Sequence, residues 1–305
     1  MSRFTLFSGT AHKELATGVA QELQIALGAC EVKRFPDGEV SVEVCEAVRG
    51  REVFIVQPTS PPLNDHLVEL LAMADACRRA SAEKITAVVP YFGYARSDQR
   101  QGRGKPIMAS MVALVAQAIG INHLITMDLH SAQIEGFFQT AVEILTAVPV
   151  MCDAIRERLP PGTVVVSPDE GRVKMAAQYA QRLNTSVIVI HKHRETGSEV
   201  HALRVVGDVR DRPCLIVDDM ISTGGTIASS IDALLDAGAR NEIFVAATHG
   251  LLLPGSREKL THAAIRKVFV TDTIPAGRET PPGFSVITIA PLLAEVIAKL
   301  VVTCN

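Results

Sequence analysis

Several signals are missing from this 305-residue sequence. Its 30 lysines and arginines nearly balance its 33 aspartates and glutamates, and the net charge of −3 gives none of the basic surface that nucleic-acid binding uses. No apolar stretch reaches membrane-spanning length, and the start, MSRFTLFSGT, lacks the basic segment and apolar run of a secretory signal. We therefore expect a cytoplasmic protein whose partners include neither nucleic acid nor a membrane.

Cysteine is present without a pattern. The sequence contains no CxxC pair and no spacing typical of zinc ligands. We predict free thiols at all of its six cysteines, Cys30, Cys45, Cys77, Cys152, Cys214 and Cys304.

The residues that are abundant indicate an α/β protein. Hydrophobic residues make up 48% of the chain, and short runs of Val and Ile alternate with segments of helical periodicity, as in βα units around a parallel sheet. The predicted strands are 4–8, 52–57, 85–90, 123–127, 163–167, 186–191, 214–217, 243–248 and 267–271. The predicted helices are about 13–27, 64–80, 109–119, 150–159, 173–183, 226–237 and 291–300.

Two halves of the chain repeat one arrangement. The run VFIVQPTS, a helix and ITAVVPY return as CLIVDDMIS, a helix and IFVAATH, with Val56 matching Val217 and Ile85 matching Ile243. We expect two duplicated domains, 1–147 and 148–290, each a mostly parallel sheet flanked by helices, and a final helix, 291–305, that packs back on the first. The alternative, that any two α/β domains look alike at this level, stays open.

The most informative segment is CLIVDDMISTGGTI, residues 214–227. An apolar strand runs into Asp218 and Asp219, and a turn of small residues then opens a helix. The positive end of a helix binds phosphate, glycines let the backbone approach the ligand, and hydroxyl groups add donors. The residues that would form this cradle are Ser222, Thr223, Gly224, Gly225 and Thr226. The alternative is an ordinary capped helix after an acidic loop.

This segment resembles the ribose-phosphate loop of the type I phosphoribosyltransferases, which include nucleobase transferases and ribose-phosphate pyrophosphokinases. The resemblance implies that Asp218 and Asp219 bind ribose hydroxyls and that the turn binds the 5-phosphate. Further segments are similar to the pyrophosphokinases from the first strand to the last helix: RFPDGEVSVEV, PYFGYARSDQR, MDLHSAQIEGFF, VVSPDEG, VVGDV, TDTIP and ITIAPLLAEVI. The predicted activity is therefore transfer of the diphosphate of Mg-ATP to the C1 hydroxyl of ribose 5-phosphate.

The resemblance implies an ATP site in the first half of the chain. In RFPDGE, Phe35 would stack near adenine, and Asp37 and Glu39 would accept from its amino group or order the loop. Without the resemblance, PDG is a common turn. In YARSDQR, Arg96 would bind ATP phosphates and Asp98 could orient it. The position after Arg96 is usually Gln in the family and is Ser97 in this sequence, which puts one nucleotide contact in doubt.

The same resemblance implies a magnesium site. His130 of MDLHSAQ and Asp169 of SPDEG would reach Mg²⁺ directly or through water. Such a shell suits a cation that keeps most of its ligands as water and phosphate oxygens. Taken alone, His130 is typical of a structural histidine, and Asp169 of a helix cap.

Two cations complete the predicted site. Lys192 and Arg194 lie two residues apart in HKHRETGSEV, so both point to one side of an extended segment. The resemblance makes them the principal catalytic cations. We expect Gly197 and Ser198, which follow, to form a flexible loop able to close over the site. The alternative is a solvated basic loop.

Two other functions compete with this hypothesis. A nucleobase phosphoribosyltransferase would use the same phosphate loop but would leave the N-terminal segments unexplained. A regulatory homologue without activity would be expected to have lost catalytic positions that are present in this sequence. The resemblance further implies a homo-oligomer built from dimers, commonly a hexamer.

Overall fold

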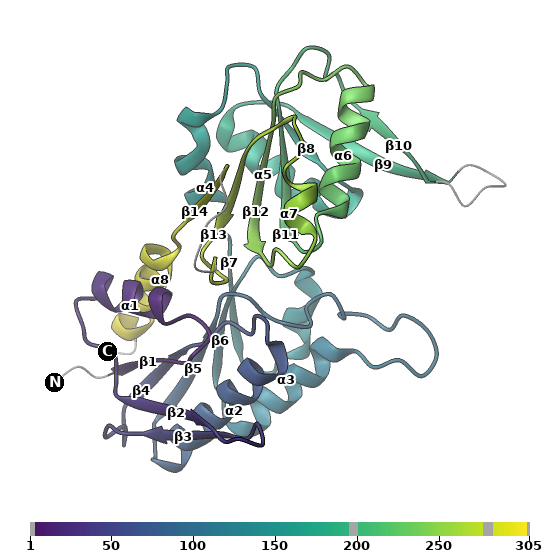
Figure 1. The fold of residues 1–305 in the computed structure, drawn as a ribbon. Helices are drawn as coiled ribbons and strands as arrows, with labels where there is room; N and C mark the ends of the chain where they lie inside the picture. Colours follow the sequence, from purple (N-terminus) through teal and green to yellow (C-terminus); the bar gives the residue numbers. More distant parts are fainter. Residues whose placement is uncertain (1–3, 195–200, 277–282, 304–305) are drawn as a thin grey trace. The chain divides into compact units, whose positions relative to one another are not determined.

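The computed structural model describes residues 4–194, 201–276 and 283–303. Within it the chain divides into two compact units. The first comprises residues 1–146, 273–275 and 288–305, and the second comprises 147–272 and 276–287. Each unit is built on its own parallel sheet (Figure 1). The expected fold class is confirmed, whereas the exact domain boundaries stay a prediction.

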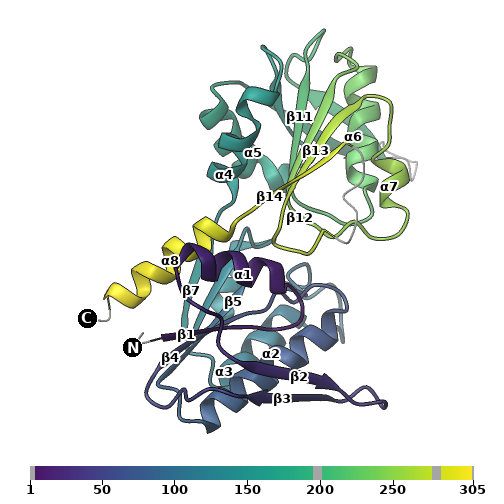
Figure 2. The same cartoon turned by 60° about the vertical axis from the view of Figure 1, so that its left-hand side comes forward.

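The first unit contains a five-stranded parallel sheet in the order β1-β4-β5-β6-β7. Figures 1 and 2 show α2 and α3 on one face of this sheet and α1 with α8 on the other. The strands are β1 Phe4–Ser8, β4 Glu52–Val56, β5 Lys84–Val89, β6 His123–Met127 and β7 Ala141–Leu145. The helices are α1 Lys13–Glu22, α2 Leu63–Arg79, α3 Met108–Ile119, the 3₁₀ segment η1 Ala132–Phe137 and α8 Ala290–Thr303. The central strands are buried on both faces, which explains their continuous apolar sequence.

An antiparallel hairpin of β2 (Cys30–Arg34) and β3 (Val40–Val44) forms a separate two-stranded sheet in this unit. β3 contacts α2, and Arg34 pairs with Asp65 at the start of α2, with 3.2 Å between Nη1 and Oδ2. The hairpin turn, residues 35–39, is thereby fixed to the unit at its base.

The second unit contains a seven-stranded sheet in the order β10-β9-β8-β11-β12-β13-β14, in which only the β9–β10 pair is antiparallel among the described residues. Its strands are β8 Val164–Ser167, β9 Val187–Arg194, β10 His201–Val206, β11 Cys214–Ile221, β12 Ile243–Gly250, β13 Ile265–Thr271 and β14 Phe284–Ile287. Its helices are α4 Val148–Ile155, α5 Val173–Leu183, α6 Gly225–Asp236 and α7 Ser256–Lys259, with short 3₁₀ turns η2 Arg156–Arg158 and η3 Glu170–Arg172. One apolar cluster of this unit includes Ile216, Ile231 and Val245.

The internal repeat expected from the sequence is present in the strand register. Val53 lies opposite Ile85 in the first sheet, and Cys214 lies opposite Ile243 in the second. Since Val53 and Cys214 each lie three residues before the matched Val56 and Val217, the two strand pairs have the same alignment. The element order also agrees, and the β2–β3 hairpin precedes β4 as the β9–β10 hairpin precedes β11.

Several elements differ from those expected. The strands β2, β3, β7, β10 and β14 were not predicted, because each is a short edge or hairpin element with much polar or exposed sequence. α1 ends at Glu22 rather than near residue 27, and α4 begins at Val148 and passes into a 3₁₀ turn after Ile155. Five cysteines are free, as predicted, while Cys304 lies outside the described residues. No described helix is long and apolar enough to cross a membrane.

Candidate active site

The order of the strands determines where a ligand can bind in the second unit. In β9-β8-β11-β12-β13, the chain moves outward from β8 in one direction to β9 and in the other to β11. Open α/β sheets bind ligands at the carboxyl ends of the two neighbouring strands between which the strand order reverses. Asp169 follows β8, and Asp218 and Asp219 lie on β11. The topology therefore brings these predicted residues to one crevice.

The acidic pair is part of the strand and is buried. β11 continues through Asp218 and Asp219 to Ile221, so the predicted strand end at Val217 is wrong. The two residues are only 9% and 2% exposed. Burial raises the pKa of the Asp218 carboxyl well above its ordinary value of 3.8, and the hydrogen bond and charge of Asp219 raise it further. The guanidinium of Arg172 opposes this shift.

The turn after the pair leads to the start of α6. Gly224 precedes the helix with a φ of +73°, in the left-handed region that glycine adopts without strain, and no described side chain caps the first turn. The backbone N–H groups at this end are thus available for an anion. Ser222 is half-buried, and Thr223 and Thr226 are exposed. That these residues bind a phosphate stays a prediction.

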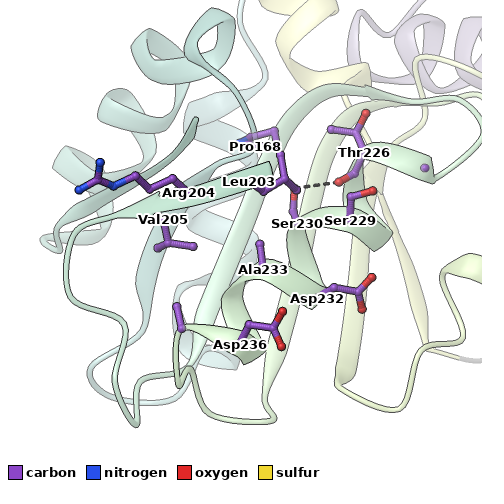
Figure 3. A pocket seen from close by; sticks show the side chains of 12 residues that line it. Pro168, Leu203, Arg204, Val205, Thr226, Ser229, Ser230, Asp232, Ala233 and Asp236 are labelled. Carbon is purple, nitrogen blue, oxygen red and sulfur yellow. Dashed lines mark hydrogen bonds between the residues drawn. The ribbon is translucent and has the colours of Figure 1, made fainter. Parts of the chain in front are cut away.

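A cavity of about 810 Å³ opens beside this helix, between β10 and α6. Figure 3 shows Leu203 and Val205 of β10 facing Ala233 of α6, while Arg204 extends away from the helix. Gly225 and Thr226 line the cavity, and the Ser230 hydroxyl donates to the Thr226 carbonyl at 2.8 Å. Because the acidic pair does not line it, the cavity adjoins the predicted sugar site only through the first residues of α6.

The two predicted metal ligands belong to different units. Asp169, in the second unit, caps η3: its Oδ1 accepts from the backbone N–H of Arg172 at 3.2 Å. His130, in the first unit, follows β6 and is half-buried. No group of three or more metal-binding side chains occurs among the described residues.

The predicted adenine-side residues form the tip of the β2–β3 hairpin. Phe35 is 52% exposed, and its backbone N–H donates to Glu39 O at 2.8 Å. The Asp37 carboxylate accepts from the backbone N–H of Glu39 at 3.1 Å, and Gly38 has a φ of +94°. This is the turn that PDG favours, and it presents the Phe35 ring to solvent.

The predicted phosphate-side residues lie in the loop before α3. Arg96 is exposed and lines a cavity of about 390 Å³ together with Ser97. Asp98 accepts from the Gln133 amide at 2.8 Å, and no ion pair with Arg96 is found in the described part of the chain. The structure thus gives Asp98 a different partner from the one suggested by the sequence.

Ser97 has a structural role that the sequence did not indicate. Its Oγ accepts from the N–H of Met108 at 3.3 Å, and its carbonyl accepts from the N–H of Ala109 at 3.1 Å. Ile107, at the cap position of α3, provides no side-chain acceptor. Ser97 therefore caps α3 from a distance of eleven residues.

Lys192 and Arg194 lie on β9. The strand continues through both residues, where they pair with Leu203 and His201 of β10. The predicted strand end at residue 191 is therefore wrong, because an antiparallel partner extends it. The expected flexible loop with Gly197 and Ser198 lies outside the described residues.

In the first unit, different residues occupy the positions that match the acidic pair and the turn of the second unit. The internal repeat places Gln57 and Pro58 at the positions of Asp218 and Asp219, and Pro61 and Pro62 precede α2. Proline has no N–H to donate to a phosphate. Glu69 fills the crevice instead: it accepts from Gln57 Nε2 at 3.0 Å and from the Thr10 hydroxyl at 2.6 Å. The matching described residues of the first unit therefore lack the acidic pair and the turn of small residues that the second unit has.

Sequence reasoning missed two cations near the site. Arg172 pairs with both carboxylates of β11, and an ideal Cβ on Gly225 would lie 3.9 Å from the Lys259 Nζ. A signal for Arg172 exists, since it follows Asp169 by three residues and a short turn could bring it back to the strand ends. Lys259 has no local signal, because α7 brings it to α6 through tertiary packing.

Comparison with known proteins shows the family of the chain. Residues 4–120 match the N-terminal domain of ribose phosphate pyrophosphokinase, and residues 196–303 match the phosphoribosyl synthetase-associated domain. Ribose-phosphate pyrophosphokinase A of Dictyostelium discoideum is 42% identical over 97% of this chain and 94% of its own. The ribose-phosphate pyrophosphokinase of Rhodopirellula baltica is 44% identical over 98% and 96%.

A solved structure extends the agreement to three dimensions. The phosphoribosylpyrophosphate synthetase of Mycobacterium smegmatis is 40% identical, covers 97% of this chain and 98% of its own, and superposes with a TM-score of 0.90. Two duplicated α/β units, together with relatives that are ribose-phosphate pyrophosphokinases over nearly the whole chain, define an enzyme of the diphosphate-transferring class. The chain belongs to the ribose-phosphate pyrophosphokinase family.

Proposed function

We propose that this ribose-phosphate diphosphokinase binds ribose 5-phosphate with β11 and the start of α6, and ATP with residues of the hairpin and the loop before α3. The observation that carries the proposal is the uncapped helix start at Gly225, which directly follows the buried Asp218 and Asp219. The helix end suits the dianionic 5-phosphate, and the carboxylates suit the ribose hydroxyls, which they can accept from.

The ATP-side assignment rests on exposure and charge. Phe35 offers an exposed aromatic face at the tip of a fixed hairpin, while Asp37 and Glu39 lie beside it in the same turn. Arg96 extends from a capped loop where its guanidinium can meet phosphate oxygens. Ser97 and Asp98 are engaged with α3 and Gln133, so we assign them to the support of Arg96.

Mg²⁺ is the cation that we propose for the diphosphate. Asp169 provides a carboxylate at the carboxyl end of β8, and His130 provides an imidazole after β6. Each of the two residues could hold the ion directly or through water, consistent with a cation that keeps several waters and phosphate oxygens. When bound, the ion would neutralise charge on the ATP phosphates.

The reaction is attack by the C1 hydroxyl of ribose 5-phosphate on the β-phosphorus of ATP. A bond forms between that oxygen and phosphorus, the bond to the α-phosphate oxygen breaks, and AMP leaves. Lys192 and Arg194 stabilise the charge that develops on the departing and equatorial oxygens. We assign no essential general base, because positioning of the two substrates supplies most of what such a transfer needs.

Two further expectations belong to this proposal. The protein assembles as a homo-oligomer built from dimers, with a hexamer as the expected form, and it acts in the cytoplasm, where ATP is abundant. Light scattering coupled to size-exclusion chromatography checks the assembly, with a monomer as the result that would contradict it.

The function is tested by measuring AMP released from ATP with and without ribose 5-phosphate. We expect AMP only when the sugar is present. A double Asp218→Asn, Asp219→Asn variant should lose use of ribose 5-phosphate while it keeps ATP binding. If that variant retained a near-native KM for the sugar, the placement of the sugar on β11 would be wrong.

A further inference from the structure

Arg172 contacts both members of the acidic pair on β11. Its Nε lies 3.4 Å from Asp218 Oδ1 and 3.3 Å from Asp219 Oδ1, so one guanidinium bridges both carboxylates. The side chains of Arg172 and Asp218 are 13% and 12% exposed, and that of Asp219 is 2% exposed. The three groups form a largely buried cluster of two negative charges and one positive charge.

The physical need for this cation follows from burial. Two adjacent carboxylates removed from water repel each other, and each loses hydration, so the pair favours taking up a proton. A protonated carboxyl accepts fewer hydrogen bonds and is a poorer partner for a diol. The guanidinium of Arg172 opposes this uptake of a proton, because its positive charge favours the ionised carboxylates.

The backbone of Arg172 is fixed by the short turn that it ends. The Asp169 carboxylate accepts from the Arg172 N–H at 3.2 Å, and Ser167 Oγ donates to Asp169 O at 2.7 Å. The turn η3 thus leads the chain from the end of β8 toward β11, at the point where the strand order reverses. The same turn that holds the proposed metal ligand Asp169 also aims the guanidinium at the sugar-binding pair.

We propose that Arg172 is a positioning residue for ribose 5-phosphate: by bridging Asp218 and Asp219 it orients both carboxyl groups and opposes their protonation, so that they can accept from the ribose hydroxyls. The inference rests on the proposed placement of the sugar. Arg172 itself contacts the pair and not the reacting phosphorus, so its loss acts on sugar binding rather than on the transfer step.

The test compares three substitutions of Arg172 with a matched control. Arg172→Met keeps an unbranched side chain similar to the aliphatic part of arginine and removes the charge. Arg172→Gln keeps polarity without charge, and Arg172→Lys restores a cation. Arg240→Met is the control, because Arg240 also pairs with two carboxylates of the same unit, Asp211 at 3.3 Å and Glu242 at 3.6 Å, but on the exposed surface.

We expect Arg172→Met to raise the KM for ribose 5-phosphate at least about tenfold, equivalent to roughly 1.4 kcal/mol. The KM for ATP and the kcat at saturating sugar should stay within about threefold of the wild type. Arg172→Lys should recover most of the sugar affinity, and Arg240→Met should match the wild type. Isothermal titration with ribose 5-phosphate alone should show the same order of affinities.

Three outcomes would overturn the inference. An unchanged KM for the sugar in Arg172→Met removes the role, a lowered KM makes Arg172 a competitor of the sugar, and equal damage to all parameters without rescue by Lys indicates a purely structural residue. If Arg172→Met does not fold, Arg172→Gln carries the same comparison. Failure of the wild type to form AMP from ATP and ribose 5-phosphate would instead reject the proposed function.

Discussion

At the scale of single residues, Asp218 and Asp219 destabilise the fold that holds them. Each carboxylate loses hydration on β11, and the two charges repel at close range. Arg172 offsets part of this cost with ion pairs to both. Natural sites commonly retain such unfavourable groups because ligand binding needs them, at the expense of stability.

Replacing Asp218 by Asn should stabilise the ligand-free protein at neutral and higher pH. Because the pKa of Asp218 is raised, the folded state binds a proton at this carboxyl more tightly than the unfolded chain does. The contribution of Asp218 to the free energy of unfolding is therefore fully present below pH 3.8 and is lost as the pH rises through the raised pKa. The amide has no charge to bury. We expect a gain of about 1 kcal/mol at pH 8, or roughly 2 to 4 °C in the melting temperature, and a smaller gain at pH 5.

Thermal unfolding at pH 5 and pH 8 measures this difference. Asp211→Asn serves as the control, because the Asp211 side chain is 89% exposed and should show little dependence on pH. A loss of stability in Asp218→Asn that grows toward pH 8 would contradict the argument.

Lys192 and Arg194 should act on the transition state more than on substrate binding. A preorganised charge that meets developing negative charge contributes on the order of 3 to 4 kcal/mol, so Lys192→Ala and Arg194→Ala should each lower kcat roughly a hundredfold to a thousandfold. Both KM values should change only a few-fold, and the double variant should lose less than the sum.

Steady-state kinetics with each substrate varied in turn provide the measurement. Arg204→Ala removes a cation from the neighbouring strand β10 and should leave kcat near the wild-type value. A normal kcat with a greatly raised KM for ATP would make Lys192 and Arg194 anchors of the ground state and would move the chemistry to Arg96 and the metal ion.

At the scale of elements, the loop before α3 shows how one side chain closes a segment. The Ser97 hydroxyl accepts a hydrogen bond from the N–H of Met108, and the Ser97 carbonyl accepts one from the N–H of Ala109. These two hydrogen bonds connect the beginning and the end of the loop 98–106. A helix end without such acceptors leaves N–H groups unsatisfied. The loop that presents Arg96 is therefore fixed to the helix that follows it.

Ser97→Ala should remove the side-chain half of this cap and cost about 1 kcal/mol, or roughly 2 to 4 °C in the melting temperature. Ser110→Ala, in the first turn of the same helix, is a suitable control because the Ser110 hydroxyl makes no cap. Differential scanning calorimetry at constant pH measures both. Equal melting temperatures for the two variants would show that water satisfies the N–H of Met108 as well as Ser97 does.

The sequence predicted the elements with strong periodicity and missed those defined by pairing. α5 was predicted at its observed bounds, and the strands β4, β5, β6 and β12 were placed to within about a residue or two, because each has a long apolar pattern of its own. β11 extends four residues past its prediction, since its register with β12 continues through acidic residues. β10 and β14 exist only because a neighbouring strand offers hydrogen bonds, which a local pattern does not contain.

The candidate site could be predicted from the sequence where one continuous segment forms it. The run 214–227 contains strand, acidic pair, turn and helix start in sequence, so the proposed roles of its residues rest on local chemistry. Arg172 and Lys259 reach the same crevice from other elements, through η3 and α7. Their arrival depends on packing, and residue type and spacing alone could not supply it.

At the scale of the whole molecule, the first unit is completed by residues from the far end of the chain. Figure 2 shows α8 lying along α1, and an added Cβ on Gly18 of α1 would come within 3.1 Å of the Ala290 Cβ. Leu293, Ala294 and Ile297 of α8 are buried. This close helix contact contributes apolar burial that residues 1–146 do not contain themselves.

Ile297→Ala should therefore destabilise the first unit by about 2 to 4 kcal/mol, the usual cost of removing a large side chain from a packed core. Ile297 is fully buried, whereas Val302 on the same helix is 68% exposed and Val302→Ala is the matched control. Limited proteolysis with mass spectrometry should find new cleavage in α1 for Ile297→Ala only. Similar stability of the two variants would mean that α8 contributes little to the unit.

The position of α8 also sets the order of events during synthesis. A ribosome makes the chain from the N-terminus at a few to some twenty residues per second, and the whole second unit emerges before residues 288–303 do. Until then, the apolar residues that α8 covers in the finished protein, on the face of the first sheet where α1 lies, remain exposed to water. The second unit can close while the first is still incomplete, so the half of the protein that is translated first is the half that is finished last.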